Sequence, residues 1–428
     1  MTVFMLPLAG LAFIFFLITT LIIRHNKKHF IGLASLNEVN PVDIGKGFRC
    51  SVDECERENG YSVHAKSKKT EKIGYSKISV LIPARNEEKN IIRLLESIGK
   101  QTYQSLEIHL LDDHSEDNTK FLAEEFASAS HLDLTVHTGL DKPDGWLGKN
   151  WACHQLAQHA TGDIFVFLDA DTWMAPTAIG EIVSGLHQYQ LDFATVWPHQ
   201  TMVTKSEKTI ISTVYSTIIT YLPTLYSYQS PRWIPGETLK KKVKPMFAAA
   251  CGQCMIFTRD AYRSSGGHEM VKDKIVEDVI LAKQVVRSGK VMRMFHGTDR
   301  LWCRMYESHS EIFNGFRKNF FAGFGNKLIP FLMAWLLHLA FYVLPPLFFL
   351  LAVTDLFATA YQYEMMTLSA VLTVFPLLQR MWIRKFLKWP KSCAWLHLPG
   401  ILWFHMLAIV VLHDRILKTG GTWKGRPV

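Results

Sequence analysis

Two kinds of hydrophobic pattern divide this chain. From residue 77 onward, short β-branched and aromatic runs alternate with amphipathic stretches of helical period, whereas both ends of the chain carry long, continuous apolar runs. The continuous runs are 3–23, 328–360, 366–378 and 396–412. The pattern therefore predicts an α/β domain with a mostly parallel, mixed sheet, a transmembrane helix before it and a region of membrane helices after it.

The alternating part predicts a series of strands and intervening helices. The predicted strands are 77–82, 106–111, 133–137, 163–168 and 192–197, and the predicted helices are 87–100, 117–128, 149–159 and 176–189. In folds of this kind, ligands bind beyond the carboxyl ends of the strands. Polar residues that directly follow a predicted strand are therefore the first candidates for a functional site.

The first apolar run predicts a retained membrane anchor, residues 1–26. A signal peptide carries its positive charges before the apolar run, but here they follow it, at Arg24, His25, Lys27 and Lys28. By the positive-inside rule, the C-terminal side of this segment is predicted to face the cytoplasm. The polar residues 27–76 predict a linker along the membrane surface, which leads into a catalytic domain at 77–325.

The C-terminal part, residues 326–428, predicts membrane helices and a basic tail. Basic residues separate the last two apolar runs and predict a cytoplasmic loop there: Arg380, Arg384, Lys385, Lys388 and Lys391. Lys418, Lys424 and Arg426 predict a cytoplasmic tail as well. The loop and the tail cannot both be cytoplasmic if every apolar run crosses the membrane once. One segment is therefore expected to be re-entrant, interfacial or split at Pro345-Pro346.

Charge and cysteine content narrow the possible functions. The net charge is +9, but Lys and Arg gather beside the apolar segments, which favours anionic lipid over nucleic acid as the partner. The seven cysteines are an odd and scattered set, which indicates reduced thiols. Cys251 and Cys254 have metal-site spacing, but no second pair completes a zinc site, and packing is the favoured interpretation.

Two acids follow the most apolar predicted strand. Asp169 and Asp171 are two residues apart, so on an extended chain their side chains point to the same side. Mg²⁺ or Mn²⁺ is commonly held by one or two carboxylates and completes its shell with phosphate oxygens. The pair therefore predicts a cation that carries substrate phosphates, with two solvated turn acids as the alternative.

Other predicted strand ends also carry polar residues. Residues 83–87, Pro-Ala-Arg-Asn-Glu, follow the first strand and open a helix whose N-terminus favours anions. Asp112 and Asp113 follow the second strand and could accept hydrogen bonds from a base or a ribose, with a turn or helix cap as the alternative. Lys149 ends a glycine-flanked turn and could reach a diphosphate, although a surface lysine often has no such role.

These motifs resemble the family 2 glycosyltransferases in order and spacing, over residues 77 to about 325. The matching motifs are Pro83-Ala-Arg-Asn-Glu87, Asp112-Asp113-x-Ser115, Gly148-Lys149, Asp169-Ala170-Asp171 and Val276-Glu277-Asp278. Residues 148–155, the Gly266-Gly267-His268 turn, the apolar C-terminal region and the closing 423–426 are similar to the membrane-bound branch that glycosylates carotenoids of the diaponeurosporenoate type.

The resemblance implies a nucleotide-sugar domain of the GT-A type and a role for each matching residue. Nucleotide-sugar contacts would come from Pro83, Ala84, Arg85, Asn86, Glu87, Asp112, Asp113, Lys149, Asp169 and Ala170. Asp171 would be the principal ligand of Mg²⁺ or Mn²⁺, with Asp169 beside it. Asp278 would be the general base, with Glu277 as the alternative. Trp146 and His268 are candidates for the acceptor side, and His268 could instead be a turn residue. His114 stands where the family usually has Gly.

The implied reaction is an inverting transfer of one sugar, with UDP-glucose as the expected donor, to a hydrophobic acceptor such as a carotenoid carboxylate or hydroxyl. The Gln-x-x-Arg-Trp motif of processive synthases is absent, and residues 314–319 stand in its place, which favours single-sugar transfer. Polyprenyl phosphate or another membrane lipid is an alternative acceptor. A non-catalytic, nucleotide-sugar-binding membrane scaffold is the alternative class.

The expected location is the cytoplasmic membrane, crossed several times, with the catalytic domain in the cytoplasm and other enzymes of the acceptor pathway as candidate partners. Residues 209–225 are uncharged and rich in Thr and Ser. They predict either an amphipathic helix in the bilayer interface, with Tyr215 and Tyr221 at headgroup depth and Trp233 nearby, or a core helix of the globular domain.

Overall fold

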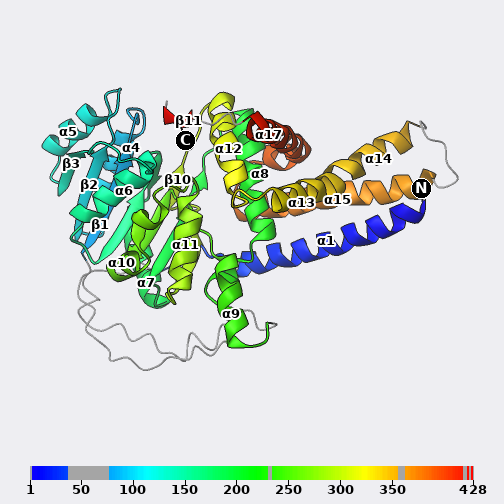
Figure 1. Cartoon of the computed structure of the whole chain (residues 1–428), viewed down its shortest axis with the longest axis horizontal. Helices are drawn as coiled ribbons and strands as arrows, with labels where there is room; N and C mark the ends of the chain where they lie inside the picture. Colours follow the sequence, from blue (N-terminus) through cyan, green and yellow to red (C-terminus); the bar gives the residue numbers. More distant parts are fainter. Residues whose placement is uncertain are drawn as a thin grey trace.

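The computed structural model has two parts, an α/β body and a group of long helices that extends from one side of it (Figure 1). It describes residues 2–36, 77–229, 234–354 and 362–417, together with short strands at 422–423 and 426–427. Residues 37–76 of the predicted linker, which include Cys50 and Cys55, lie outside the described residues, as does Trp233.

A seven-stranded mixed sheet forms the centre of the body. Its strands are β1 (Ile78–Ala84), β2 (Leu106–Asp112), β3 (Leu134–Thr138), β4 (Ile164–Leu168), β6 (Phe193–Trp197), β8 (Cys254–Thr258) and β9 (Met292–His296). The order is β3-β2-β1-β4-β8-β6-β9, and only β8 runs antiparallel to its neighbours. All five predicted strands are confirmed, whereas β8 and β9 were not predicted.

Helices cover both faces of this sheet. They include α4 (Ile91–Gly99), α5 (Thr119–Ala129), α6 (Gly148–His159), α7 (Ala178–Gln188), α10 (Arg259–Ser264) and α11 (Glu277–Arg287). Successive side chains of β4 alternate between two hydrophobic cores: Phe165 and Phe167 belong to one, and Val166 and Leu168 to the other. Burial on both faces explains why β4 is a continuous apolar run without polar alternation.

A second, three-stranded sheet lies against the end of β4. It consists of β5 (Thr172–Met174), β10 (Leu301–Cys303) and β7 (His199–Gln200), with β10 in the middle. The antiparallel pairing of β10 with β5 sets Cys303 opposite Thr172, the residue after Asp171. This small sheet therefore fixes the backbone that carries the predicted metal ligand.

Among the described residues, four helices are long and apolar enough to cross a membrane: Ala9–His29, Leu328–Val353, Gln362–Phe386 and His397–Leu417. The first is most of α1 (Thr2–His29). The second joins α13 (Leu328–His338) to α14 (Leu344–Val353) through a π-helical turn, so Pro345 and Pro346 begin α14 without ending the helix. The third and fourth are α15 (Gln362–Phe386) and α17 (His397–Leu417).

The predicted basic loop between the last two apolar runs is shorter than expected. Arg380, Arg384 and Lys385 lie within α15, and Arg380 is buried. Only Lys388 and Lys391 remain in the connection to the short helix α16 (Ser392–Trp395). The assignment of Arg380 to a cytoplasmic loop was therefore wrong, because helical periodicity continues through the charged residues.

Helix α8 (Lys205–Tyr221) connects the body to the long helices (Figure 1). It begins with a capping box formed by Thr204 and Glu207, and its Ile211 and Tyr215 are buried in the main core of the body. At its far end, the Asn26 amide of α1 donates to the backbone oxygens of Ile219 and Leu222, each at 2.8 Å. The core-helix interpretation of this segment agrees with the structure.

Candidate active site

The carboxyl ends of β2, β1 and β4 meet at one edge of the sheet, because the three strands are parallel neighbours. Ala84 pairs with Asp112, and the backbone N–H of Asp113 donates to the Ala84 oxygen at 2.8 Å. Asp169 directly follows β4. The three predicted strand-end motifs therefore share this edge, as the α/β pattern requires.

A cluster of charged groups lies beyond β4. The Lys149 ammonium, in the first turn of α6, is 2.8 Å from Asp169 Oδ1 and 3.3 Å from Glu277 Oε1, in the first turn of α11. The backbone N–H of Gly252 donates to Asp278 Oδ2 at 2.9 Å. Residues from three separate motifs are thus brought together.

Gly252 forms the back of this cluster. A Cβ atom at this position would lie 3.3 Å from Lys149 Nζ and 3.4 Å from both Asp278 Oδ2 and Glu277 Oε1. Any side chain would therefore crowd the acids and the lysine, and the absence of one lets the backbone N–H reach the carboxylate directly.

Lys149 remains positively charged within the cluster. Burial lowers the pKa of Lys149, but the carboxylates of Asp169 and Glu277 outweigh that effect and hold the pKa well above its usual value. The side chain is 27% exposed, so one face of the ammonium stays accessible to a ligand. A fixed charge of this kind can neutralise part of a diphosphate.

Asp278 is poised to exchange a proton near neutrality. Burial and then the negative charge of Glu277 raise its pKa, while Lys149 and the backbone N–H groups of Val279 and Gly252 lower it, and the net value is about 7. The Val279 N–H donates to Asp278 Oδ1 at 2.8 Å and fixes the carboxylate plane. These are the properties expected of a general base that works at neutral pH.

Asp171 has an oxygen suited to a cation. Burial first, and then the charges of Asp169 and Glu87, raise its pKa to about 7, although a hydrogen bond with Cys303 opposes the rise. Its Oδ1 atom is buried and has no hydrogen-bond partner among the described residues. An uncompensated carboxylate oxygen of this kind fits a divalent ion.

The protein itself supplies only part of a metal shell. Within the described parts of the chain, no group of three or more His, Cys, Asp or Glu side chains is arranged to hold a metal ion. Asp169 and Asp171 therefore fit an ion that completes its shell with phosphate oxygens and water, which is the usual habit of Mg²⁺.

The turns after β1 and β2 hold one another in place. Arg85 donates to the backbone oxygens of Asp113 and His114 at 2.6 and 2.7 Å, and the Asn86 N–H donates to Ser115 Oγ at 2.9 Å. His114 has φ of 54°, in the left-handed region that favours glycine. The histidine therefore keeps the turn that the related family usually forms with Gly.

Asp112 and Asp113 are both 3% exposed at this turn. The Ser115 N–H donates to Asp112 Oδ2 at 3.2 Å, while Asp112 Oδ1 is buried without a hydrogen-bond partner among the described residues. Asp112 thus stabilises the turn through Oδ2, and its Oδ1 can still accept a hydrogen bond from a ligand.

His268 does not fit the predicted acceptor side. It is fully buried, its Nδ1 atom lies 2.9 Å from the Tyr262 hydroxyl, and its ring centroid is 4.8 Å from that of Phe167. Burial lowers its pKa to about 3, so the ring is neutral. The prediction of acceptor contact was wrong, and His268 is a core residue of the Gly266-Gly267 turn.

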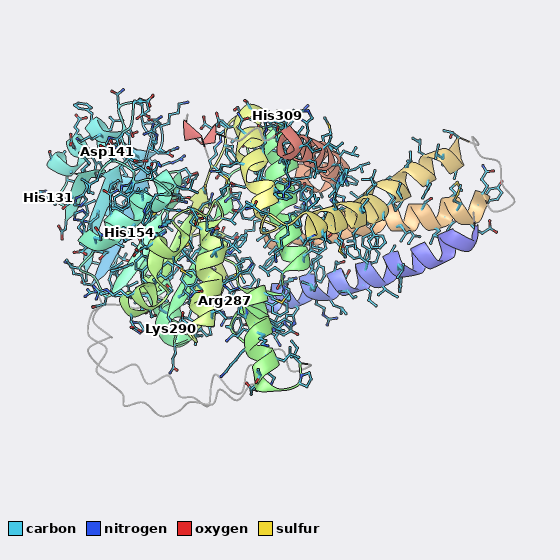
Figure 2. All side chains as sticks on the ribbon, in the orientation of Figure 1. His131, Asp141, His154, Arg287, Lys290 and His309 are labelled. Atoms are coloured by element: carbon cyan, nitrogen blue, oxygen red, sulfur yellow. The ribbon has the colours of Figure 1, made fainter. Side chains whose placement is uncertain are left out.

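Trp146, the other acceptor-side candidate, is half-buried at the start of α6. Its ring lies 5.0 Å from that of Trp151 and 4.9 Å from that of His154, measured between centroids. Figure 2 labels His154 on the α/β body. The three rings form an aromatic group at the N-terminal end of α6, the helix that carries Lys149.

The sequence prediction missed a polar network beneath the acids. The backbone oxygen of Gln253 accepts from the Asp169 N–H at 3.1 Å, and its side chain contacts Cys303 Sγ at 2.9 Å and the Tyr215 hydroxyl at 3.3 Å. Gln253 lies between Cys251 and Cys254, whose buried side chains agree with the predicted packing role. An antiparallel strand begins at the edge where its parallel neighbours end, so residues before β8 reach the same site.

Comparisons with known proteins agree with this geometry. Residues 79–266 match the model of the family described as "Glycosyl transferase family 2". The 4,4'-diaponeurosporenoate glycosyltransferase of Staphylococcus haemolyticus (strain JCSC1435) is 28% identical over 243 residues, which cover 56% of this chain and 60% of that protein. The protein of the same name from Staphylococcus aureus (strain MRSA252) is 26% identical over 283 residues, 64% of this chain and 69% of the relative.

Among solved structures, the mannosyltransferase PcManGT from Pyrobaculum calidifontis, in complex with GDP-Man and Mn²⁺, is similar to this chain with a TM-score of 0.43 and 17% identity. The similarity covers 80% of this chain and 88% of that one.

Proposed function

The chain carries a family 2 glycosyl transferase domain, and from this premise we propose that it transfers one sugar from UDP-glucose to the carboxylate or hydroxyl of a carotenoid at the membrane. The observation that carries the proposal is the gathering of Asp169, Glu277 and Asp278 around Lys149, with Asp171 beside them, at the ligand-binding edge of the sheet. Such a group would act on both substrates of a glycosyl transfer. The lysine and the metal-binding acids would stabilise the departing diphosphate, and an acid would activate the acceptor.

The donor would lie along the carboxyl ends of β1, β2 and β4. The interlocked turns at 83–87 and 112–115 would hold the nucleoside, with Asp113 at the base and Asp112 supporting it. Lys149 would face the diphosphate as a point charge. Asp171 and Asp169 would hold Mg²⁺ or Mn²⁺, and that ion would act as a Lewis acid that stabilises the departing nucleoside diphosphate.

The acceptor would approach from the side of Glu277 and Asp278. A hydroxyl acceptor must lose a proton as its oxygen attacks the anomeric carbon, and the Asp278 carboxylate would take it. A carotenoid acid with a pKa of about 4 to 5 is already ionised and needs no base. Attack on the face opposite the leaving diphosphate would invert the anomeric centre in one displacement.

The choice of a carotenoid acceptor is supported by the relatives named 4,4'-diaponeurosporenoate glycosyltransferases. It is also supported by the four long apolar helices, because α8 packs against the membrane helices and also contacts the active-site network through Tyr215. The basic residues at the end of α1 favour a cytoplasmic position for the domain.

The decisive experiment supplies membranes that contain the protein with labelled UDP-glucose, Mn²⁺ and either 4,4'-diaponeurosporenoate or a polyprenyl phosphate, and identifies the labelled product by mass. We expect a glucosyl ester of the carotenoid acid, and no product from membranes that contain Asp171→Asn at equal abundance. A labelled polyprenyl product would overturn the carotenoid assignment. No product with any nucleotide sugar, despite metal-dependent nucleotide binding, would favour the scaffold alternative.

A further inference from the structure

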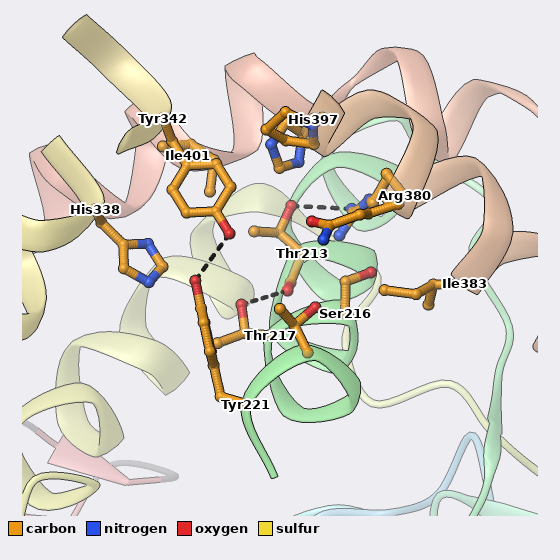
Figure 3. Close-up of a pocket in the computed structure, with 13 residues that line it drawn as sticks. Thr213, Ser216, Thr217, Tyr221, His338, Tyr342, Arg380, Ile383, His397 and Ile401 are labelled. Atoms are coloured by element: carbon orange, nitrogen blue, oxygen red, sulfur yellow. Dashed lines mark hydrogen bonds between the residues drawn. The ribbon is translucent and has the colours of Figure 1, made fainter. Parts of the chain in front are cut away.

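A small cavity of about 30 Å³ lies between α8, α13 with the π-helical turn that follows it, α15 and α17 (Figure 3). Its polar lining residues include Thr213, Ser216, Tyr221, Tyr342, Arg380 and His397. None of the residues assigned to the active site lines this cavity. It is therefore a second feature, on the membrane side of α8.

Arg380 is a buried cation without a carboxylate partner. Its side chain belongs to a residue that is 2% exposed, within one of the four helices apolar enough to span a membrane. Its guanidinium donates to the Cys393 backbone oxygen and to the hydroxyls of Ser212 and Thr213, all of which are neutral. No Asp or Glu among the described residues lies within ion-pair distance of it. A buried, unpaired charge in such a helix is costly, and it commonly marks a functional site.

Further polar atoms around this cavity lack partners. Both ring nitrogens of His397 and the hydroxyl oxygen of Ser216 are buried without a hydrogen bond to any described residue. They come from α17 and α8, while Arg380 comes from α15. Buried polar atoms are nearly always satisfied by protein, water or ligand, so two helices present unmet hydrogen-bonding capacity to the space beside the charge of Arg380.

We propose that this cavity binds the oxyanion head of a membrane amphiphile, a carboxylate or a phosphate. A cavity of this volume holds roughly two water-sized groups, which is the size of the two oxygens of a carboxylate or of two of the oxygens of a phosphate. Arg380 supplies the opposite charge, and His397 and Ser216 supply hydrogen bonds.

The neighbouring surface suits the apolar tail of such a molecule. Leu337 on α13 and Leu402 on α17 are 40% and 43% exposed, and both helices also contribute residues to the cavity lining. The tail would lie along the exposed apolar side chains of these two helices. The inference does not depend on the proposed function, because it concerns residues with no part in sugar transfer.

The test measures binding to the purified full-length protein in neutral detergent. The probes are radiolabelled oleate, dioleoyl phosphatidic acid and inorganic phosphate, with oleyl alcohol as an uncharged competitor. The variants are Arg380→Met and His397→Phe. The matched control is Arg384→Met, because Arg384 lies one turn later on α15, donates to the Trp389 oxygen and does not line the cavity.

We expect saturable binding of oleate or of phosphatidic acid to the wild type and to Arg384→Met, and binding weakened by about tenfold or more in Arg380→Met and His397→Phe. Oleate alone would identify a carboxylate, phosphatidic acid alone a lipid phosphate, and inorganic phosphate a head-only ligand. Equal affinity in all variants, or displacement by oleyl alcohol, would overturn the proposal and leave water as the occupant. If Arg380→Met fails to fold, His397→Phe decides alone, because it retains the guanidinium.

Discussion

Two cations in this protein, the half-buried Lys149 and the buried Arg380, have opposite surroundings. Lys149 at the sheet edge lies against the carboxylates of Asp169 and Glu277, whereas Arg380 in α15 meets only hydroxyls and a backbone oxygen. At the sheet edge, acids outnumber the lysine, so the site retains capacity for a further cation and the phosphates it carries. At Arg380, the positive charge is unmatched by the protein, so the complementary ligand is an anion.

The largest effect is expected from Asp171→Asn, which removes charge from the acid-rich region. Because a bound metal contributes several kcal/mol of transition-state stabilisation, we expect turnover to fall about 10³-fold at saturating Mn²⁺. The fall is measured by comparing the turnover of the variant with that of the wild type as a function of Mn²⁺ concentration. Asp163→Asn is the control, because Asp163 precedes the opposite end of β4 and is exposed. Equal activity of the two variants would contradict the metal assignment.

Asp278→Asn tests which acid acts as the base. With a hydroxyl acceptor, loss of the base is expected to reduce kcat at least about 100-fold. With a carboxylate acceptor, which arrives ionised, the loss is expected to be less than about tenfold. Paired assays of one variant on both acceptor types measure the difference. Identical losses would show that Asp278 has another role, and Glu277→Gln would then be the variant to compare.

Removing each cation is expected to change stability in opposite directions. Lys149→Met leaves two neighbouring carboxylates unpaired, and it should lower the free energy of unfolding by roughly 2 kcal/mol, less than at a fully buried pair because Lys149 is partly exposed. Arg380→Met removes an unpaired buried charge and should leave stability unchanged or raise it, in detergent free of added anions. The thermal unfolding midpoints of the two variants, compared with that of the wild type, measure the two stability changes. Destabilisation of both variants to the same extent would remove the distinction between the two sites.

The pH dependence should differ between acceptors. Burial and Glu277 raise the pKa of Asp278 to about 7, so its basic form is lost as the pH falls through that value. With a hydroxyl acceptor at saturating metal, we expect the rate to fall about tenfold per pH unit below 7. With a carboxylate acceptor, the rate should change little between about pH 6 and 8. Superimposable profiles would exclude Asp278 as the base.

Features that depend on local sequence could be predicted. The strand ends at Asp112, Lys149 in its turn, and Asp169 with Asp171 were all found from short motifs, because an apolar strand followed by polar residues is a local signal. The antiparallel β8 was not predicted, because strand order depends on pairing between distant segments. Gln253 and Gly252 were missed for the same reason.

The environments of single side chains were the least predictable part. Arg380 looked like a cytoplasmic loop residue because basic residues follow it, yet packing of α15 against α8 buries it. His268 looked accessible because two glycines precede it, yet the turn they form directs its ring into the core against Phe167. In both cases tertiary contacts, which the local pattern does not encode, decide exposure.

The fully buried Asn26 links the first apolar helix to the part of the chain that carries the candidate active site. Its side chain joins α1 to the end of α8 through two donated hydrogen bonds and accepts two more from Thr224. Under the proposed function, these four hydrogen bonds would hold the catalytic edge at one distance from the bilayer. The protein would then select acceptors by length. It would glycosylate molecules whose reactive end extends that far from the bilayer and would not reach the reactive end of shorter ones.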